Sequence, residues 1–185
     1  MRLLINITLI VLTLLYPFAV YFSLEHIEPR YLALLLAVLF GLRFLWVRKG
    51  QAQRQSLWLL ATVGLFALLV FVSNSESGLL FYPVLINLLM FTGFAWTLFQ
   101  PPPMIERFAR LSKPDLPEYA IAYTRKLTVI WCAFFLFNAL VAAYTALFCS
   151  LAVWSLYNGL IAYCLVGLLF IIEYPIRLLV ERRYR

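Results

Sequence analysis

Three asparagines stand inside long apolar runs of this sequence and are its clearest candidates for chemistry. Asn138 interrupts the run that follows Arg125 and Lys126, and Asn87 and Asn158 interrupt two further runs. An amide surrounded by apolar side chains needs a hydrogen-bonding partner. The three asparagines therefore predict either contacts between helices or the lining of a polar cavity, and the sequence leaves both open.

A carboxylate and a guanidinium form the second candidate. Glu173 and Arg177 are four residues apart, which is the spacing of an ion pair along one helix, and Pro175 lies between them. The alternative is a proton carrier. No second acid stands inside an apolar run to relay a proton, so we expect a structural pair.

Catalytic and metal-binding motifs are absent from the sequence. It contains no H-E-x-x-H, phosphate-binding loop, G-x-S-x-G or acidic metal cluster. His26 is flanked by Glu25 and Glu28, but three ligands so close together rarely fit one ion, so we expect an acidic loop. The three cysteines lack metal-ligand spacing and predict small apolar side chains. We assign no catalytic residue, metal or cofactor and lean against an enzyme.

Composition identifies the elements that position these groups. The chain has 185 residues, is 65% hydrophobic and only 12% charged, unlike soluble domains with about 25% charged residues. Six runs are long and apolar enough, or nearly so, to cross a bilayer as helices. They predict an all-α polytopic membrane protein, a single transmembrane domain over residues 1–185, with spans at about 3–24, 31–47, 57–73, 79–99, 127–148 and 156–175.

The charges between the runs predict the orientation. With both termini in the cytoplasm, fourteen of the fifteen Lys and Arg residues fall on the cytoplasmic side and only Arg30 lies outside. Arg43, near the end of the second run, can extend to the cytoplasmic headgroups. The net charge of +7 then reflects topology and attraction to anionic inner-leaflet lipids, without nucleic acid. We expect a multi-pass protein of a bacterial inner membrane.

The cytoplasmic segment 100–126 carries most of the remaining signals. The "QPPP" sequence ends the fourth run, and "PMIERFARLSK" predicts a short amphipathic helix on the membrane surface. "DLPE" at Asp115–Glu118 resembles a capping box, so the fifth helix is expected to begin near Leu116. We expect a lipid- or partner-binding surface formed by Arg107, Arg110, Lys113, Arg125 and Lys126.

Small and aromatic residues predict the packing. Alanines at 139, 142, 143 and 146, together with Gly159, Ala162 and Gly167, favour close approach of the fifth and sixth helices. Aromatic residues near the ends of runs, among them Tyr82 and Trp154, are typical of the belt at a membrane surface.

Four segments carry a resemblance: "YPVLINLLMF", "PPPMIERFARL", "YTRKLTVIWCAFFLFNALVAA" and "WSLYNGLIAYCLVGLLFIIEYPIR". Together they resemble a family of small bacterial inner-membrane proteins found with arylpolyene and xanthomonadin-type pigment-lipid biosynthesis genes. The same half of the chain is distantly similar to the intracellular septation protein A family, through Pro83 with Asn87 and through Trp131 with Phe134 and Phe135.

The resemblance implies a non-enzymatic protein of cell-envelope biogenesis. Such a protein is an accessory or scaffold for lipid-linked arylpolyene-type synthesis or export, and its basic face docks anionic lipid or an acidic partner such as acyl carrier protein. One alternative is a small lipid or small-molecule transporter, in which Asn87, Asn138 and Asn158 line one cavity with Glu173. An integral-membrane enzyme is a third reading.

Overall fold

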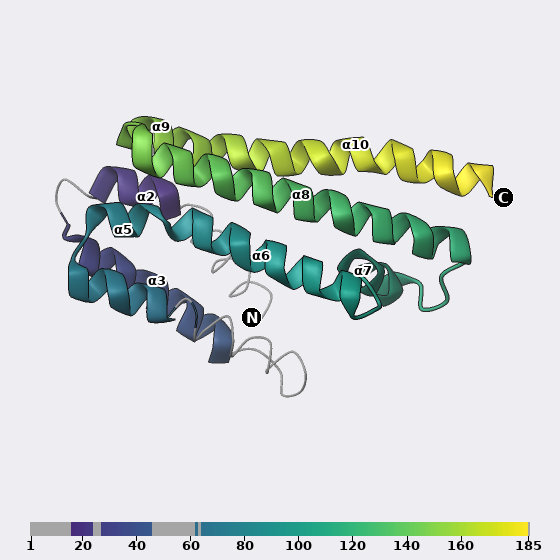
Figure 1. The fold of residues 1–185 in the computed structure, drawn as a ribbon, viewed down its shortest axis with the longest axis horizontal. Coiled ribbons are helices and arrows are strands. Elements are labelled where there is room, and N and C mark those ends of the chain that lie inside the picture. The colour runs from purple at the N-terminus through teal and green to yellow at the C-terminus, as the bar shows by residue number, and fades with distance from the viewer. Residues whose placement is uncertain (1–15, 24–26, 46–61, 63, 185) are drawn as a thin grey trace, which may run out of the picture. The chain divides into compact units, whose positions relative to one another are not determined.

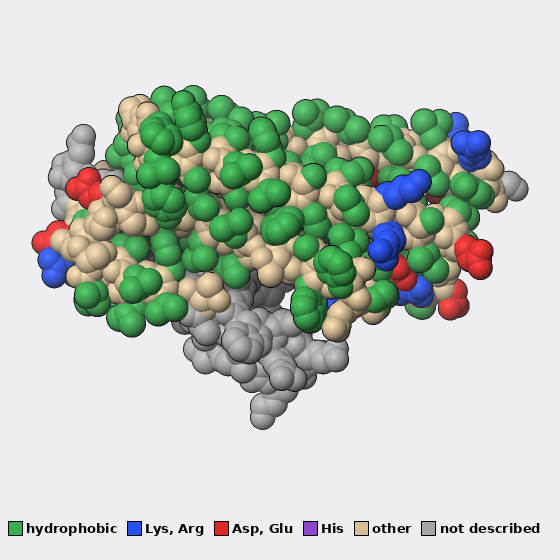
Figure 2. All heavy atoms as spheres, in the orientation of Figure 1, with side chains coloured by type: hydrophobic (Ala, Val, Ile, Leu, Met, Phe, Trp, Pro, Cys, Tyr) green, Lys and Arg blue, Asp and Glu red, His purple; other side chains and the backbone are tan. Residues whose placement is uncertain are grey.

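The computed structural model describes residues 16–23, 27–45, 62 and 64–184, and in these every element is a helix. Within these residues, three helical segments are long and apolar enough to cross a membrane: Glu76–Phe99, Glu118–Phe148 and Leu151–Arg183. Their exposed positions are largely apolar (Figure 2), including Phe99 at 82% and Ile171 at 70% exposure. Apolar surface of this extent has the character of a membrane-facing side. The described chain is therefore a helical membrane protein.

The chain divides into two compact units, and each is described by itself. The first unit comprises residues 1–82 and 145–160, and the second comprises residues 83–144 and 161–185. Figure 1 labels their helices.

The first unit contains α2 (Tyr16–Ser23), α3 (Pro29–Leu45), a helix at Gly64–Ser73, α5 (Glu76–Leu80) and α9 (Leu151–Leu156). Helix α2 packs on α9, and α3 packs on α5. The turn after the Gly64–Ser73 helix uses Asn74 with a left-handed φ of 47°, which Asn tolerates better than most residues. Its Oδ1 accepts from the Arg30 amide at 3.2 Å. Arg30 and Asn74, which lie in two segments predicted to be outer loops, are thus joined.

The second unit is built from α6 (Tyr82–Phe99), α7 (Met104–Ser112), α8 (Glu118–Phe148) and α10 (Ala162–Arg183), apart from the residues at the ends of α6 and α8 that belong to the first unit. Its core is formed by Phe94, Trp131 and Cys132, with side chains of all four helices packed around them. Phe94 and Trp131 each contact Phe135, with ring centroids 5.1 and 5.6 Å apart. The Trp-x-x-Phe-Phe run of the sequence is therefore the centre of this core.

Several helix boundaries differ from the predicted ones. The predicted span 79–99 is two helices, α5 and α6, separated at Phe81, because Pro83 lacks an N–H and fits only the first turn of a new helix. Helix α8 begins at Glu118 and not near Leu116, because a residue that precedes proline is disfavoured in the helical conformation. The carbonyl of Pro117 instead accepts from the amides of Ala120 and Ile121.

The sixth predicted span is also longer than expected. The supposed loop before it is helix α9, capped by the Ser150 hydroxyl, and a π-helical turn at Tyr157–Ile161 leads into α10. Helix α10 then continues through Pro175 to Arg183. The helix is longer than the apolar run from which the span was predicted, because polar residues can continue a helix beyond the membrane. The amphipathic helix predicted after "QPPP" is confirmed as α7. The predicted spans 3–24, 31–47 and 57–73 fall partly outside the described residues.

Candidate functional site

Asn87 and Asn138 meet between α6 and α8. The Asn138 Nδ2 donates to the Asn87 Oδ1 at 3.0 Å, and the Asn87 Nδ2 donates to the Pro83 carbonyl at 2.8 Å. Asn138 is 5% exposed. The two amides therefore form a donor chain that ends on the backbone of α6. Such an arrangement joins two helices in a fixed register.

Asn158 lies in the first unit, in the π-helical turn. Its Nδ2 donates to the Trp154 carbonyl at 2.9 Å and to the Thr145 hydroxyl at 3.3 Å. It is 5% exposed. The side chain thus ties the π-helical turn to the end of α8.

Trp154 and Gly159 complete this packing. The predicted aromatic-belt position of Trp154 is wrong: the side chain is 0% exposed, and its Nε1 donates to the Leu80 carbonyl at 3.0 Å. Gly159 was expected at the contact of the fifth and sixth helices, but a Cβ there would lie 2.7 Å from the ring of Phe18 on α2. Gly167 has nothing within 4 Å of such a Cβ. The absence of a side chain at Gly159 therefore allows Phe18 of α2 to pack closely against it.

Glu173 and Arg177 form the predicted pair on α10, with 3.9 Å between Arg177 Nε and Glu173 Oε1. Sequence reasoning missed the third member, Tyr123 on α8, whose hydroxyl donates to the same carboxylate at 3.1 Å. The guanidinium carbon of Arg177 also lies 5.4 Å from the ring centroid of Tyr174. The Glu173 carboxylate therefore has one partner on α8 and one on α10.

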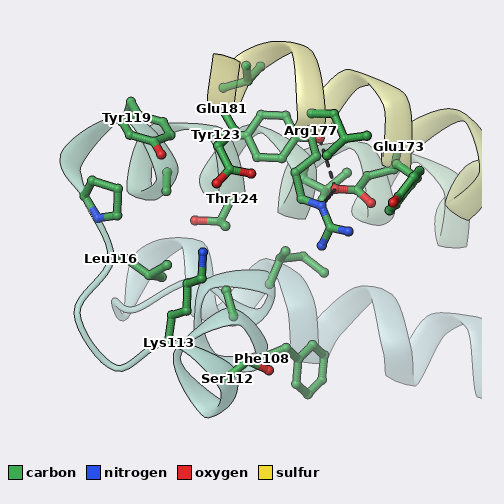
Figure 3. A pocket seen from close by; sticks show the side chains of 18 of the residues that line it. Phe108, Ser112, Lys113, Leu116, Tyr119, Tyr123, Thr124, Glu173, Arg177 and Glu181 are labelled. Carbon is green, nitrogen blue, oxygen red and sulfur yellow. Dashed lines mark hydrogen bonds and ion pairs between the residues drawn. The ribbon is translucent and has the colours of Figure 1, made fainter. Parts of the chain in front are cut away.

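A cavity of about 570 Å³ opens beside this carboxylate, between α7, α8 and α10 (Figure 3). Its walls are mostly apolar, with Leu127, Trp131 and Phe170 among them. Polar side chains at its border include Glu173, Arg177 and Lys113. Asn87, Asn138 and Asn158 are not among its lining residues. This cavity therefore does not bring the three asparagines together with Glu173.

Two of the five cations predicted to form a binding surface are engaged inside the protein. Arg107 donates to the carbonyls of Pro102 and Gln100, at 2.7 and 3.1 Å, and so caps the segment after α6. Arg110 donates to Glu106 Oε1 at 2.7 and 2.8 Å. Glu106 is 4% exposed. These two arginines hold the segment together.

The other three, Lys113, Arg125 and Lys126, are exposed. No hydrogen bond or ion pair joins their side chains to any described residue. In Figure 2, the visible basic side chains of this unit gather where α7 and the end of α10 lie.

Two buried threonines that the sequence analysis did not single out attach α7 to its neighbours. Thr97 on α6, 2% exposed, accepts from the Met104 amide at 2.8 Å. Thr128 on α8, 0% exposed, accepts from the Ile105 amide at 3.3 Å. The first amides of a helix have no partner within it, and the preceding Pro103 offers no side-chain oxygen. Two other helices therefore supply the cap.

Metal ligands do not cluster in the described part of the chain: no group of three or more His, Cys, Asp or Glu residues could hold an ion there. Glu25 and His26 lie outside the described residues, and the side chain of Arg43 is likewise not described. Cys132 is buried in the core, whereas Cys164 is exposed on α10.

Comparison with known proteins adds no relative. No family model, no curated protein and no solved structure matches this chain.

Proposed function

We propose that this chain is a six-span protein of a bacterial inner membrane, with both termini in the cytoplasm. It serves cell-envelope biogenesis as a non-enzymatic accessory or scaffold, for which lipid-linked arylpolyene-type synthesis or export is the leading candidate. Its exposed cations dock the protein on anionic inner-leaflet lipid or on an acidic partner such as acyl carrier protein.

One observation carries the proposal. The rings of Tyr119, at the start of α8, and Tyr184, after α10, stack at 4.7 Å between centroids. The segment 100–126 and the C-terminal residues, both predicted to be cytoplasmic, therefore meet at one end of the second unit. Exposed Lys113, Arg125 and Lys126 lie in or beside that segment, as the proposed orientation requires.

The orientation is tested by reporter fusions. A green fluorescent protein fused after Arg185 should fluoresce, because the reporter folds in the cytoplasm, and alkaline phosphatase at the same position should be inactive. Insertions at Ser75 should give the opposite pattern. Active phosphatase after Arg185 would refute the orientation.

Docking is tested by reversing the two adjacent charges on α8. The R125E/K126E variant should bind purified bacterial acyl carrier protein at least tenfold more weakly than the wild type at low salt, because exposed charges steer and hold such complexes. R182E/R183E makes the same change of charge on α10 and should retain most binding. Equal binding by R125E/K126E and the wild type would count against the surface.

The second candidate, a small lipid or small-molecule transporter, is favoured by the cavity and not by the asparagines. Pockets of about 300–1,000 Å³ with apolar walls and a few polar groups are typical ligand sites. Uptake of a lipid into vesicles containing the protein would favour this reading.

A further inference from the structure

The cavity between α7, α8 and α10 has charged side chains in its wall. It holds two cations that approach from different elements. Lys113 ends α7, Arg177 projects from α10, and Figure 3 shows both side chains directed toward the same space. Two positive charges therefore face a largely apolar hollow.

Lys113 and Arg177 have hydrogen-bond donors without a described protein partner, whereas the Glu173 carboxylate has two partners. Glu173 accepts from the Tyr123 hydroxyl at 3.1 Å and pairs with Nε of Arg177. The terminal nitrogens of Arg177 and the Nζ of Lys113 have no protein acceptor among the described residues. A guanidinium edge of this kind binds a carboxylate or phosphate through two hydrogen bonds. Glu181 also lines the cavity and has its own interaction.

Part of the cavity wall is apolar. Leu127, Trp131 and Phe170 line it, and the rings of Trp131 and Phe170 are 5.1 Å apart between centroids. These side chains belong to the parts of α8 and α10 that are apolar enough to cross a membrane. An alkyl chain is the chemistry that this surface accepts, at about 25 cal/mol for each Å² removed from water.

The volume limits the ligand to one chain. At about 30 Å³ for each heavy atom with its hydrogens, the share of one water molecule in the liquid, 570 Å³ holds roughly twenty such atoms. A long-chain fatty acid has about this size, and a lysophosphatidate, about half as large again, would fill the cavity with its chain and extend its head through the opening. A two-chain phospholipid has more than twice as many heavy atoms.

We propose that this cavity binds a single-chain amphiphile with an anionic head, a carboxylate or a phosphate, held by Lys113 and Arg177, while its chain lies against Trp131 and Phe170. The inference does not depend on the docking of a carrier protein, because Arg125 and Lys126 do not line the cavity.

Photo-crosslinking tests the site directly. The purified full chain in dodecyl maltoside micelles is irradiated with a diazirine-bearing palmitate, and labelled residues are identified by peptide mass spectrometry. Labels should concentrate on cavity-lining residues of α8 and α10. Unlabelled oleate and oleoyl lysophosphatidate should compete, and the stronger competitor identifies carboxylate or phosphate as the preferred head.

Variants separate the role of the cations from that of the fold. K113M/R177M should lower labelling in the cavity at least tenfold, and K113M alone, which removes an exposed cation without a described protein partner, should lower it severalfold. R182M removes an exposed cation of α10 that does not line the cavity, and it should label like the wild type. R125E/K126E should also label like the wild type, even where carrier-protein binding is lost.

Four results would overturn the proposal. They are labels outside the lining residues, equal labelling of K113M/R177M and the wild type, competition by dioleoyl phosphatidic acid as strong as that by oleate, and competition by inorganic phosphate alone. The third would indicate an ordinary bilayer lipid, and the fourth an anion site without a chain pocket.

Discussion

The Asn87–Asn138 contact and the Glu173 cavity lie in the same unit, and they differ in how far their polar groups are satisfied. Between the asparagines, each amide donor that is described ends on a protein acceptor. At the cavity, Arg177 and Lys113 keep donors that meet no described acceptor. A polar group satisfied within the protein stabilises the fold, whereas an unsatisfied charge beside an apolar hollow is available to a ligand. The difference separates contacts that join helices from a site that binds.

Breaking the ion pair of Glu106 and Arg110 should cause the largest loss of stability, because the Glu106 carboxylate is nearly buried. In R110M the Glu106 carboxylate loses its partner, and we expect a loss of about 3 kcal/mol in the free energy of unfolding. Equilibrium unfolding in mixed dodecyl maltoside and SDS micelles measures it. R125M, at an exposed cation, is the control and should change little. A loss below about 1 kcal/mol in R110M would show that Glu106 is satisfied without Arg110.

Removing the threonine hydroxyls that cap α7 should cause the next largest loss of stability. Thr97→Val and Thr128→Val each leave a helix amide without its acceptor, which costs about 1–3 kcal/mol when the amide is buried. Thr92→Val is the matched control, because the exposed Thr92 hydroxyl bonds only to the Leu88 carbonyl of its own helix. The same unfolding assay applies. Equal stability of all three variants would remove the threonines from the attachment of α7.

The asparagine contact should have a smaller effect. Asn138→Leu should lower stability by about 0.6–1.7 kcal/mol, the range for hydrogen bonds between membrane helices. A double-mutant cycle with Asn87→Leu isolates the pair, and a coupling energy near zero would mean that the hydrogen bond contributes nothing. Labelling of the cavity should be unchanged in both variants. A loss of labelling in these variants would show that the asparagine contact and the cavity act as one site.

Lys113→Met should have the smallest effect on stability. The side chain is exposed and has no described partner, so the free energy of unfolding should change by less than about 0.5 kcal/mol. Thermal unfolding in micelles suffices to check this. A larger loss would place Lys113 among the satisfied contacts and would explain reduced ligand labelling by damage to the fold.

Asn138 shows how far the sequence analysis reached and where it stopped. Its isolation in an apolar run predicted a partner on another helix, but not which one, because each apolar run presents many equivalent faces. Tyr123 was missed because a tyrosine near a helix start is ordinary, and Thr97 and Thr128 because threonine is common in membrane helices. The bonds of Arg107 and Arg110 within their segment could not be foreseen, because a cation in a basic segment looks the same whether it faces water or an acceptor of the protein.

The sequence alone determined the helical class, the long apolar helices and the short helix after the prolines. Those features follow from local composition, since apolar length, proline and glycine act within a few residues of chain. The tertiary structure alone decided that Asn138 meets Asn87, that Glu106 is buried, and that Lys113 and Arg177 face one cavity. Asn87 and Asn138 are 51 positions apart in the chain, and Lys113 and Arg177 are 64 positions apart. Their placement, like the burial of Glu106, depends on how neighbouring helices pack.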